Sequence, residues 1–422
     1  MKALHVVHGS PVIERAGGTE RYVHALAAAT GAPELAFEPA RDGFLERLDA
    51  PYPLYTCGRS GSPLTFRETW SNPHFDAALG EVLDRERPDI IHAHHFAHGG
   101  FTWVEVAAAR GVPWVVTLHD FHTLCARGQM VTARTEPCEG PDATRCASCL
   151  GPHLHATPLT QALGAIAGRI GVRELAKREL GERPPGERVV ERWRARERAA
   201  NRALEGASAL ISPSKHLAQR FEREGWQVVQ LDLPLLKQVE PRPPPTGETR
   251  LLFVGAMIPS KGPDLLLEAV RLLDERCERP PRVDLWGPLQ PWDGQPEWEE
   301  RLLALARETP NAFYNGTFSP DDRDDVYGAA DVLVVPSRWP ENSPLVVREA
   351  LGAGLTVVGT EATGVEEIDP DAITVPRDDR EALAAALAPL CEQRPQRRAP
   401  ARWPLDDHLA SLERLYCEAL ER

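Results

Sequence analysis

The chain has 422 residues, a length that favours two or more domains with separate cores. Its 48 basic and 62 acidic residues give a net charge of −14, which argues against sequence-independent nucleic-acid binding. No apolar run approaches the roughly 20 residues of a membrane span, and Met1 to Val7 resembles a strand more than an export signal. We therefore expect a soluble, cytoplasmic protein whose eight cysteines are reduced or hold a metal.

The first half alternates short apolar runs with helical patterns. Gly17-Gly18 separates the first strand from a helix that continues through Ala29, and a short helix covers 101–110. Glycines at such a turn let backbone N–H groups approach a phosphate or a sugar, although a simple tight turn is the alternative. Strands are predicted at 2–7, 34–37, 89–92, 114–118, 208–211 and 228–231. Strands separated by helices indicate βαβ units and a parallel sheet.

Histidines follow two of these strands. His119 lies in an L-H-D sequence at a strand end, where it could donate to a sugar hydroxyl or a developing charge and could titrate near neutrality. A purely structural histidine is the alternative. His92, His94 and His95 follow another strand end, and we expect them in the wall of a pocket or in the core rather than in catalysis.

Four cysteines lie close together in the sequence, in the pattern C-x12-C-x7-C-x2-C. Four thiolates, two of them in a C-x-x-C pair, match the needs of tetrahedral zinc, although the spacing is looser than in most zinc knuckles. A structural zinc is therefore predicted in a loop that has little core of its own. Free thiols, an iron–sulfur cluster and disulfides remain open. The four residues are Cys125, Cys138, Cys146 and Cys149.

An arginine-dense helical region covers 160–202, where basic residues alternate with glutamates. A solvated helix pair with surface salt bridges is one interpretation. The other is a basic surface for an anionic acceptor or for the cytoplasmic face of the inner membrane, which would make the protein peripheral to that membrane.

The proline-rich segment 241–247 can form neither a helix nor a central strand and is the predicted linker. The alternation restarts after it, with strands at 250–254, 283–286, 312–314, 331–335, 355–358 and 373–375 and helices at 264–273 and 297–307. We predict two doubly wound, Rossmann-like α/β domains, 1–240 and 248–400, facing a central cleft. The tail, 401–422, contains an amphipathic helix at 405–420 whose apolar face needs a partner.

The stretch from Trp339 to Gly354 joins a strand to a helix. Ser343 followed by Pro344 is typical of an N-cap with proline at the first helical position, and Gly354 is typical of a helix end. The free N–H groups of such a helix start favour anions. Glu341 and Glu349 border the same place, and their carboxylates can accept hydrogen bonds from hydroxyl groups, as a sugar nucleotide would require.

The loop from Gly255 to Gly262 follows the first strand of the second half and carries Lys261 ahead of a helix. This arrangement suggests phosphate binding with lysine as a mobile charge. An exposed loop lysine without a role is the alternative.

Taken together, these segments resemble the retaining glycosyltransferases of family 4, which have the two-domain GT-B fold. The likeness covers nearly the whole chain. Its most specific part is E-x7-E, Glu341 to Glu349, and it is supported by G-x5-K-G at 255–262, by L-H-D at 118–120 and by P-D-I-I-H-A-H at 88–94.

The resemblance implies a role for each matching residue. Glu341 would contact the hydroxyls of the donor sugar, Glu349 the ribose, Lys261 the diphosphate, and His119 would lie beside the transferred sugar. The backbone at Gly17 and Gly18 and at the start of the helix after Glu341 would assist at the diphosphate. Gly255 belongs to the lysine loop, and the tail helix would cross back to the first domain. Further donor-binding residues implied in this way are Asn342, Ser343, Leu345, Val346, Gly316, Thr317 and Phe318, the last three lining the base pocket.

One departure from the family pattern concerns the diphosphate. Many relatives have arginine after the first glycine of the lysine loop, where this chain has Ala256. Either Lys261 and the helix dipoles suffice for the diphosphate, or another arginine such as Arg338 or Arg348 reaches in. The implied reaction is transfer from a UDP-, GDP- or ADP-sugar to a hydroxyl of a glycan, a lipid-linked saccharide or a small molecule, without a catalytic metal. A sugar-nucleotide epimerase and a catalytically weak binding scaffold are the alternatives. The base, the sugar and the acceptor stay open.

Overall fold

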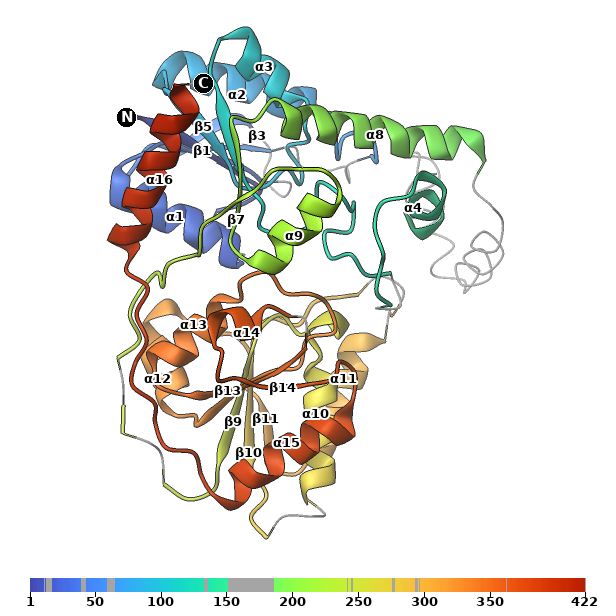
Figure 1. Ribbon diagram of the computed structural model, residues 1–422, viewed down its shortest axis with the longest axis vertical. Coiled ribbons are helices and arrows are strands. Elements are labelled where there is room, and N and C mark those ends of the chain that lie inside the picture. Colours follow the sequence, from blue (N-terminus) through green and yellow to red (C-terminus); the bar gives the residue numbers. More distant parts are fainter. Residues whose placement is uncertain are drawn as a thin grey trace.

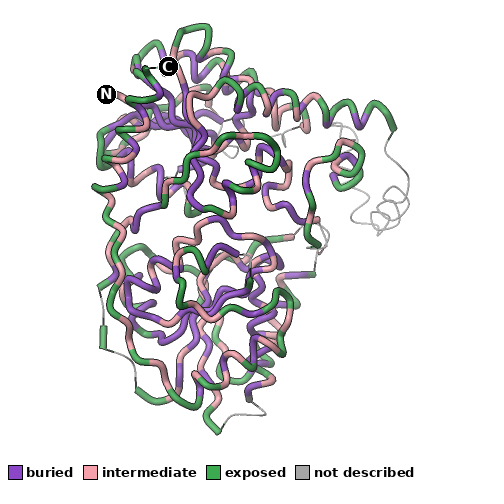
Figure 2. Tube along the Cα trace, viewed as in Figure 1, coloured by how far each residue is buried: buried purple, intermediate pink, exposed green. Residues whose placement is uncertain are grey.

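The computed structural model describes residues 1–10, 12, 17–38, 43–58, 65–132, 136–150, 186–240, 242–243, 246–274, 278–292, 295, 297–361 and 363–421. These residues form two α/β halves, one above the other in Figure 1, each built around its own sheet. In Figure 2 the strands at the centre of both halves are buried, and the outer helix faces and loops are exposed. None of the described helices is long and apolar enough to cross a membrane.

The first half has a sheet with the strand order β3-β4-β2-β1-β5-β6-β7-β8, in which β3 alone is antiparallel to its neighbour. Its elements are β1 (Ala3–Val7), α1 (Gly18–Thr30), β2 (Glu34–Phe37), β3 (Gly43–Leu48), β4 (Leu54–Gly58), α2 (Pro73–Glu86), β5 (Ile90–Ala93), α3 (Trp103–Ala109), β6 (Trp114–Thr117), α4 (Ala143–Leu150), α8 (Glu187–Glu205), β7 (Ala209–Ser212), α9 (Lys215–Arg223) and β8 (Val229–Gln230).

The second half has a parallel sheet with the order β11-β10-β9-β12-β13-β14. Its elements are β9 (Arg250–Val254), η1 (Pro259–Lys261), α10 (Pro263–Asp274), β10 (Arg282–Trp286), α11 (Trp298–Glu308), β11 (Ala312–Tyr314), η2 (Pro320–Asp322), α12 (Arg323–Gly328), β12 (Val332–Val335), α13 (Leu345–Gly352), β13 (Thr356–Thr360), α14 (Val365–Ile368), β14 (Ile373–Val375) and α15 (Arg380–Glu392). The tail helix α16 (Leu405–Leu420) follows in the chain.

Alternate residues of each central strand enter cores on opposite faces of the sheet, as the period of two requires. In β1, Leu4 and Val6 pack with α2, α3, α8 and α9, whereas Ala3 and Val7 pack with α1 and α16. In the second half, α10, α11 and α15 cover one face and α12 and α13 the other. Both sheets are therefore doubly wound, which confirms the predicted fold class.

The tail helix α16 crosses back to the first half and lies beside α1 in Figure 1. Its buried residues Leu412 and Tyr416 belong to the core that contains β1 and α1, and the Tyr416 hydroxyl is 2.6 Å from His92 Nδ1. Tyr22 in α1 makes a matching hydrogen bond of 2.6 Å to His408 Nε2. The apolar face of the tail helix therefore packs against the first half, as predicted from the sequence.

The arginine-dense region is only partly described, because residues 151–185 lie outside the described residues. In α8, Arg194 and Arg198 both approach the carboxylate of Glu191, at 3.9 and 2.7 Å, and Arg196 is fully buried. Surface pairing of this kind agrees with the interpretation of a solvated helix. Contact with an anionic acceptor or a membrane stays a prediction.

Candidate active site

The predicted donor-site residues lie in loops at the carboxyl ends of the strands and in the first turns of the helices that follow, where the two halves meet. His119 follows β6, and its carbonyl accepts a hydrogen bond of 2.6 Å from Asn342 Nδ2, which belongs to the loop after β12. Gly18 begins α1, and a Cβ atom added there would lie 3.3 Å from Leu345 at the start of α13. The structure therefore brings residues of both halves together at this edge.

The helix after Glu341 starts later than the sequence predicts. Pro344 occupies the N-cap position with φ −64° and ψ 112°, and α13 begins at Leu345 and ends at Gly352. The extended ψ of Pro344 keeps it out of the helix, so Ser343 does not cap it, and the Ser343 hydroxyl is instead 3.4 Å from Arg348 Nη2. The prediction of Ser343 as N-cap was wrong by one residue, and Val346 remains in the first turn.

Lys261 and Glu341 form an ion pair in which the ammonium contacts both carboxylate oxygens, at 2.5 Å from Oε1 and 2.7 Å from Oε2. Glu341 is only 4% exposed, while Lys261 keeps a quarter of its side chain accessible. The turn that carries Lys261 depends on Gly262, which has φ 71° and whose added Cβ would lie 2.0 Å from the Pro336 carbonyl oxygen. A backbone this close leaves room for glycine alone.

Two residues that the sequence analysis missed hold the Glu341 carboxylate in place. The Ser337 hydroxyl donates to Oε1 at 2.7 Å, and Trp339 Nε1 donates to the same oxygen at 2.9 Å. Lys261 Nζ also lies 5.0 Å from the centre of a Trp339 ring, a cation–π distance. Oε1 is therefore held by three donors and Oε2 by Lys261, so the two oxygens have different surroundings.

Arg338 and Arg348, the two arginines considered as a second cation for the diphosphate, are both held elsewhere by other residues. The Arg338 guanidinium binds Asp264 at 2.7 and 3.1 Å and Asp378 at 2.6 Å. Arg348 is buried over a Trp403 ring at 4.8 Å, and burial lowers its pKa to about 10. The alternative in which one of these two arginines reaches in at the diphosphate is not met in this structure, and the alternative in which Lys261 and the helix dipoles suffice stays a prediction.

Glu349 lies inside α13, and its carboxylate has two polar partners in the second half. The Tyr327 hydroxyl donates to Oε2 at 2.5 Å, and Arg323 Nε is 3.1 Å from Oε1. Burial raises the pKa of Glu349, against the opposing charges of Arg323 and of Arg21 in α1 and the hydrogen bond from Tyr327. Tyr327 and Arg323 carried no sequence signal.

The remaining predicted donor residues lie at the same edge of the second sheet. The Gly255 amide, directly after β9, donates to the Trp286 carbonyl at 2.9 Å, and the Gly287 amide donates to the Gly316 carbonyl at 2.7 Å. Gly316 has φ 75°, and the Phe318 ring packs edge-on against Trp286. Thr317 lies between them. Gly17 is the N-cap of α1 and, as a glycine, supplies no side-chain acceptor, while the Glu20 carboxylate in the first turn is hydrogen-bonded to its own backbone amide.

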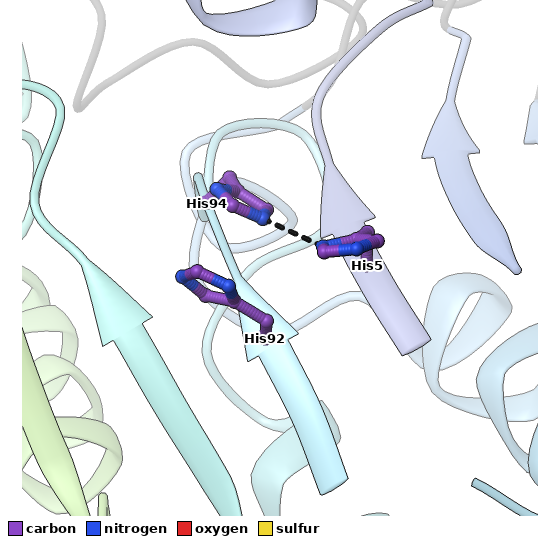
Figure 3. A group of neighbouring side chains, drawn as sticks. All are labelled: His5, His92 and His94. Carbon is purple, nitrogen blue, oxygen red and sulfur yellow. Dashed lines mark hydrogen bonds between the residues drawn. The ribbon is translucent and has the colours of Figure 1, made fainter. Parts of the chain in front are cut away.

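Three buried histidines form a tight group in the first half (Figure 3). Their ring nitrogens lie within 4.8 Å of one another, which is close enough for a metal. However, His5 Nδ1 is hydrogen-bonded to His94 Nε2 at 3.0 Å, and the two nitrogens of His92 face Tyr416 and Thr117 at 2.6 and 2.7 Å. Because these nitrogens already have partners, the group fits a hydrogen-bonded core, as expected for His92 and His94.

The hydrogen-bonded histidines continue to the site, since His94 Nδ1 is 3.3 Å from His119 Nε2. Burial lowers the pKa of His119 to about 3 and that of His5 to about 4. The expectation that His119 titrates near neutrality was therefore wrong, because the ring is desolvated. His95 differs: burial lowers its pKa, but the Asp120 carboxylate at 3.1 Å outweighs burial and raises it.

Comparison with known proteins agrees with this geometry. A family model described as Glycosyltransferase Family 4 matches residues 16–135, and one described as Glycosyl transferases group 1 matches residues 248–393. The two models fall on the two halves of the fold. The chain belongs to glycosyltransferase family 4.

Curated relatives of this family 4 chain are distant. The lipopolysaccharide 1,2-N-acetylglucosaminetransferase of Salmonella typhimurium is 28% identical over 173 residues, 40% of this chain and 43% of that protein. The D-inositol 3-phosphate glycosyltransferase of Streptomyces bingchenggensis is 27% identical over 282 residues, 66% of this chain and 52% of that protein. The chain thus matches about half the length of these two relatives.

Solved structures with the same fold cover almost the whole chain. Sucrose-phosphate synthase from Thermosynechococcus elongatus superposes with a TM-score of 0.67 at 18% identity, covering 99% of both chains. Anabaena HepE in complex with UDP gives a TM-score of 0.62 at 15% identity, covering 99% of this chain and 100% of HepE. These likenesses support the GT-B architecture.

Proposed function

We propose that this protein is a retaining glycosyltransferase that moves a sugar from a nucleotide diphosphate donor to a hydroxyl acceptor. The observation that carries the proposal is the ion pair between Lys261 and Glu341, next to the start of α13 and close to His119 of the other half. In a nucleotide-sugar donor the diphosphate is bonded directly to the sugar. A cation for the phosphates in contact with a carboxylate for the sugar hydroxyls matches such a donor. Structures of similar fold contain UDP or UDP-glucose, which agrees with a nucleotide-sugar donor.

Donor binding would exchange the partners of this ion pair. A diphosphate offers Lys261 more negative charge than one carboxylate does, so the ammonium would move to the phosphate oxygens. Oε2 of Glu341 would then be released to accept hydrogen bonds from sugar hydroxyls. Oε1 would stay fixed by Ser337 and Trp339, which keeps the carboxylate oriented while its charge partner changes.

The other predicted residues would hold the remaining parts of the donor. Glu349, positioned by Tyr327 and Arg323, would accept hydrogen bonds from the ribose hydroxyls. The amides at Gly18 and at the start of α13 would face the diphosphate. His119, held neutral by burial, would act beside the sugar as a hydrogen-bonding imidazole and not as a cation.

The chemical step is the one that the family resemblance implies, and it agrees with the lack of an obvious nucleophile among the described residues. The bond between the anomeric carbon and the leaving phosphate oxygen would break, and the acceptor oxygen would attach on the same face, which retains the configuration. The acceptor proton would pass to the leaving diphosphate. Lys261 and the helix starts would stabilise the negative charge that develops there, so no catalytic metal is required.

The domain boundaries are part of the same proposal. Residues 1–240 would carry the acceptor side, 241–247 the linker, 248–400 the donor side, and 401–422 the returning tail. The placement of α16 on the first half and the separate cores of the two sheets support this division.

A donor screen tests the proposal. The purified protein is incubated with UDP-, GDP- and ADP-sugars, ligand binding is followed by thermal shift, and donor consumption is followed by chromatography. We expect one nucleotide class to raise the melting temperature and to be hydrolysed slowly without acceptor. Binding without turnover under any acceptor would favour a non-catalytic scaffold, and no binding of any donor would refute the proposal.

A further inference from the structure

The four cysteines of the loop after β6 line a single cavity of about 240 Å³. They come from three separate segments. Cys125 lies in the turn that follows His119 and Asp120, Cys138 directly follows an isolated antiparallel β-bridge between Val131 and Pro137, and Cys146 and Cys149 lie in α4. All four thiols are free of disulfides. Convergence of all four on one cavity is unexpected for cysteines without a shared role, since residues 13 and 8 positions apart have no local reason to meet.

Local backbone contacts set the direction of each cysteine. The Cys125 amide donates to the Phe121 carbonyl at 2.7 Å, and the Cys138 amide donates to the Met130 carbonyl at 2.9 Å. Cys146 and Cys149 are three residues apart in a helix, so they lie on one face. The Asp142 amide donates to Cys146 Sγ at 3.5 Å, which fixes the direction of that side chain.

A buried cation that contacts one wall of the cavity also lacks a counter-charge close by among the described residues. Arg196 of α8 is fully buried, and its guanidinium donates to the carbonyls of His122 and Thr123. The guanidinium also lies 5.4 Å from the centre of a Trp193 ring, and Trp193 borders the cavity. Within the described ranges it has no carboxylate in ion-pair contact. A buried cation without a counter-charge is costly. One Zn²⁺ with four thiolates carries a net charge of −2, which would supply a counter-charge for Arg196.

The two ends of this segment are packed differently. Phe121, Leu124 and Met130 are buried in the main core of the first half, whereas among the described residues a small cluster of five buried residues joins α4 to α8. Metal ligands would add direct cross-links between α4 and the start of the segment. Four thiolates leave no open coordination position, so the metal would be structural.

We propose that Cys125, Cys138, Cys146 and Cys149 bind one structural zinc ion, with release of the thiol protons. The metal would fix the segment from Asp120 to Leu150 against α8. Because this segment starts directly after His119, the ion would also hold one wall of the candidate donor site without touching the donor. Among the described residues, no three of these four sulfur atoms lie within 4.8 Å of one another. Zinc binding would therefore draw the four side chains inward around the cavity.

The experiment measures metal content in the full chain, purified under reducing conditions without a polyhistidine tag. We expect about one zinc per chain by elemental analysis, and its release when a mercurial reagent titrates the thiols. The C146S/C149S double variant should contain less than a tenth of that zinc. The matched control Cys417→Ser, an exposed cysteine on α16, should keep all of it.

A second readout covers the case in which the double variant does not fold. The wild-type protein is treated with a strong chelator and its melting temperature is followed; it should fall, and it should recover on addition of zinc alone. The proposal is overturned by a folded protein that neither contains zinc nor takes it up, by zinc that persists in the double variant, or by iron with visible absorbance in place of zinc. These readouts need no donor, so they are independent of the proposed transferase activity.

Discussion

Replacing Lys261 by methionine is the sharpest test of the donor site, because it removes the ammonium and keeps a chain of similar length. If Lys261 stabilises the leaving diphosphate, the loss of one charged donor should lower kcat by roughly 10²–10³, or about 2.7–4 kcal/mol in the transition state. Glu341 keeps its hydrogen bonds from Ser337 and Trp339, so the fold should survive. The free energy of unfolding should fall by at most the roughly 3–5 kcal/mol that removing one partner of a buried ion pair costs.

The assay follows donor consumption at saturating donor, with melting temperature and nucleotide affinity measured on the same preparation. Lys261→Arg should restore part of kcat, since it retains the charge with altered geometry. The control is Lys215→Met, an exposed lysine also located where the halves meet, and it should behave as wild type. A Lys261→Met variant with wild-type kcat would show that another cation serves the diphosphate, and it would refute the assignment.

Three other perturbations have expected outcomes. Glu349→Gln should weaken nucleotide binding by about 10-fold or more in calorimetry, because a charged acceptor for the ribose hydroxyls is lost; unchanged affinity would exclude that role. The free energy of unfolding should fall as the pH drops below about 6.5 toward 4, by about 1.4 kcal/mol per pH unit for each histidine. The reason is that burial lowers the pKa of His5 and His119 in the folded state, so the unfolded chain binds more protons in this range. A free energy of unfolding that does not change with pH would contradict this. Gly262→Ala should destabilise by more than about 3 kcal/mol, whereas Gly111→Ala, with φ 67° and open space, should cost about 1 kcal/mol in the same urea titrations.

The parallel core could be predicted from the sequence because its strands are short apolar runs buried on both faces. The predicted ranges 34–37, 250–254, 312–314 and 373–375 agree with the observed strands. The hairpin β3–β4 was missed for a physical reason: β3 is an edge strand whose residues are largely exposed, so it has no continuous apolar run. The tail helix was predicted with the bounds that the structure shows. Its apolar face predicted that it would pack against another part of the chain.

The candidate site could be predicted only as a set of strand ends. Parallel strands end at one edge of a sheet, so Lys261, Glu341 and Glu349 were expected together, and the structure does join Lys261 to Glu341. Which groups hold each carboxylate depends on contacts far apart in the sequence, and no local pattern carries that information. The protonation of His119 was missed because it is set by burial among other histidines, which only the folded chain creates.

The two glutamates of the E-x7-E pattern differ in a way that bears on the order of events at the site. Glu341 is neutralised by a lysine on a short turn, a cation that can move. Glu349 is held by Arg323, whose side chain is only 7% exposed, and by Tyr327, which is fully buried. A ribose could therefore dock against a carboxylate that is already in place, while the sugar has to wait until the diphosphate has drawn Lys261 away from Glu341. On this argument a nucleoside diphosphate alone should release Glu341, and a nucleoside without phosphate should not. Nucleoside monophosphate, diphosphate and nucleoside can be compared for their effect on the affinity of the free sugar: enhancement by the diphosphate alone supports the exchange of partners, and equal enhancement by all three contradicts it.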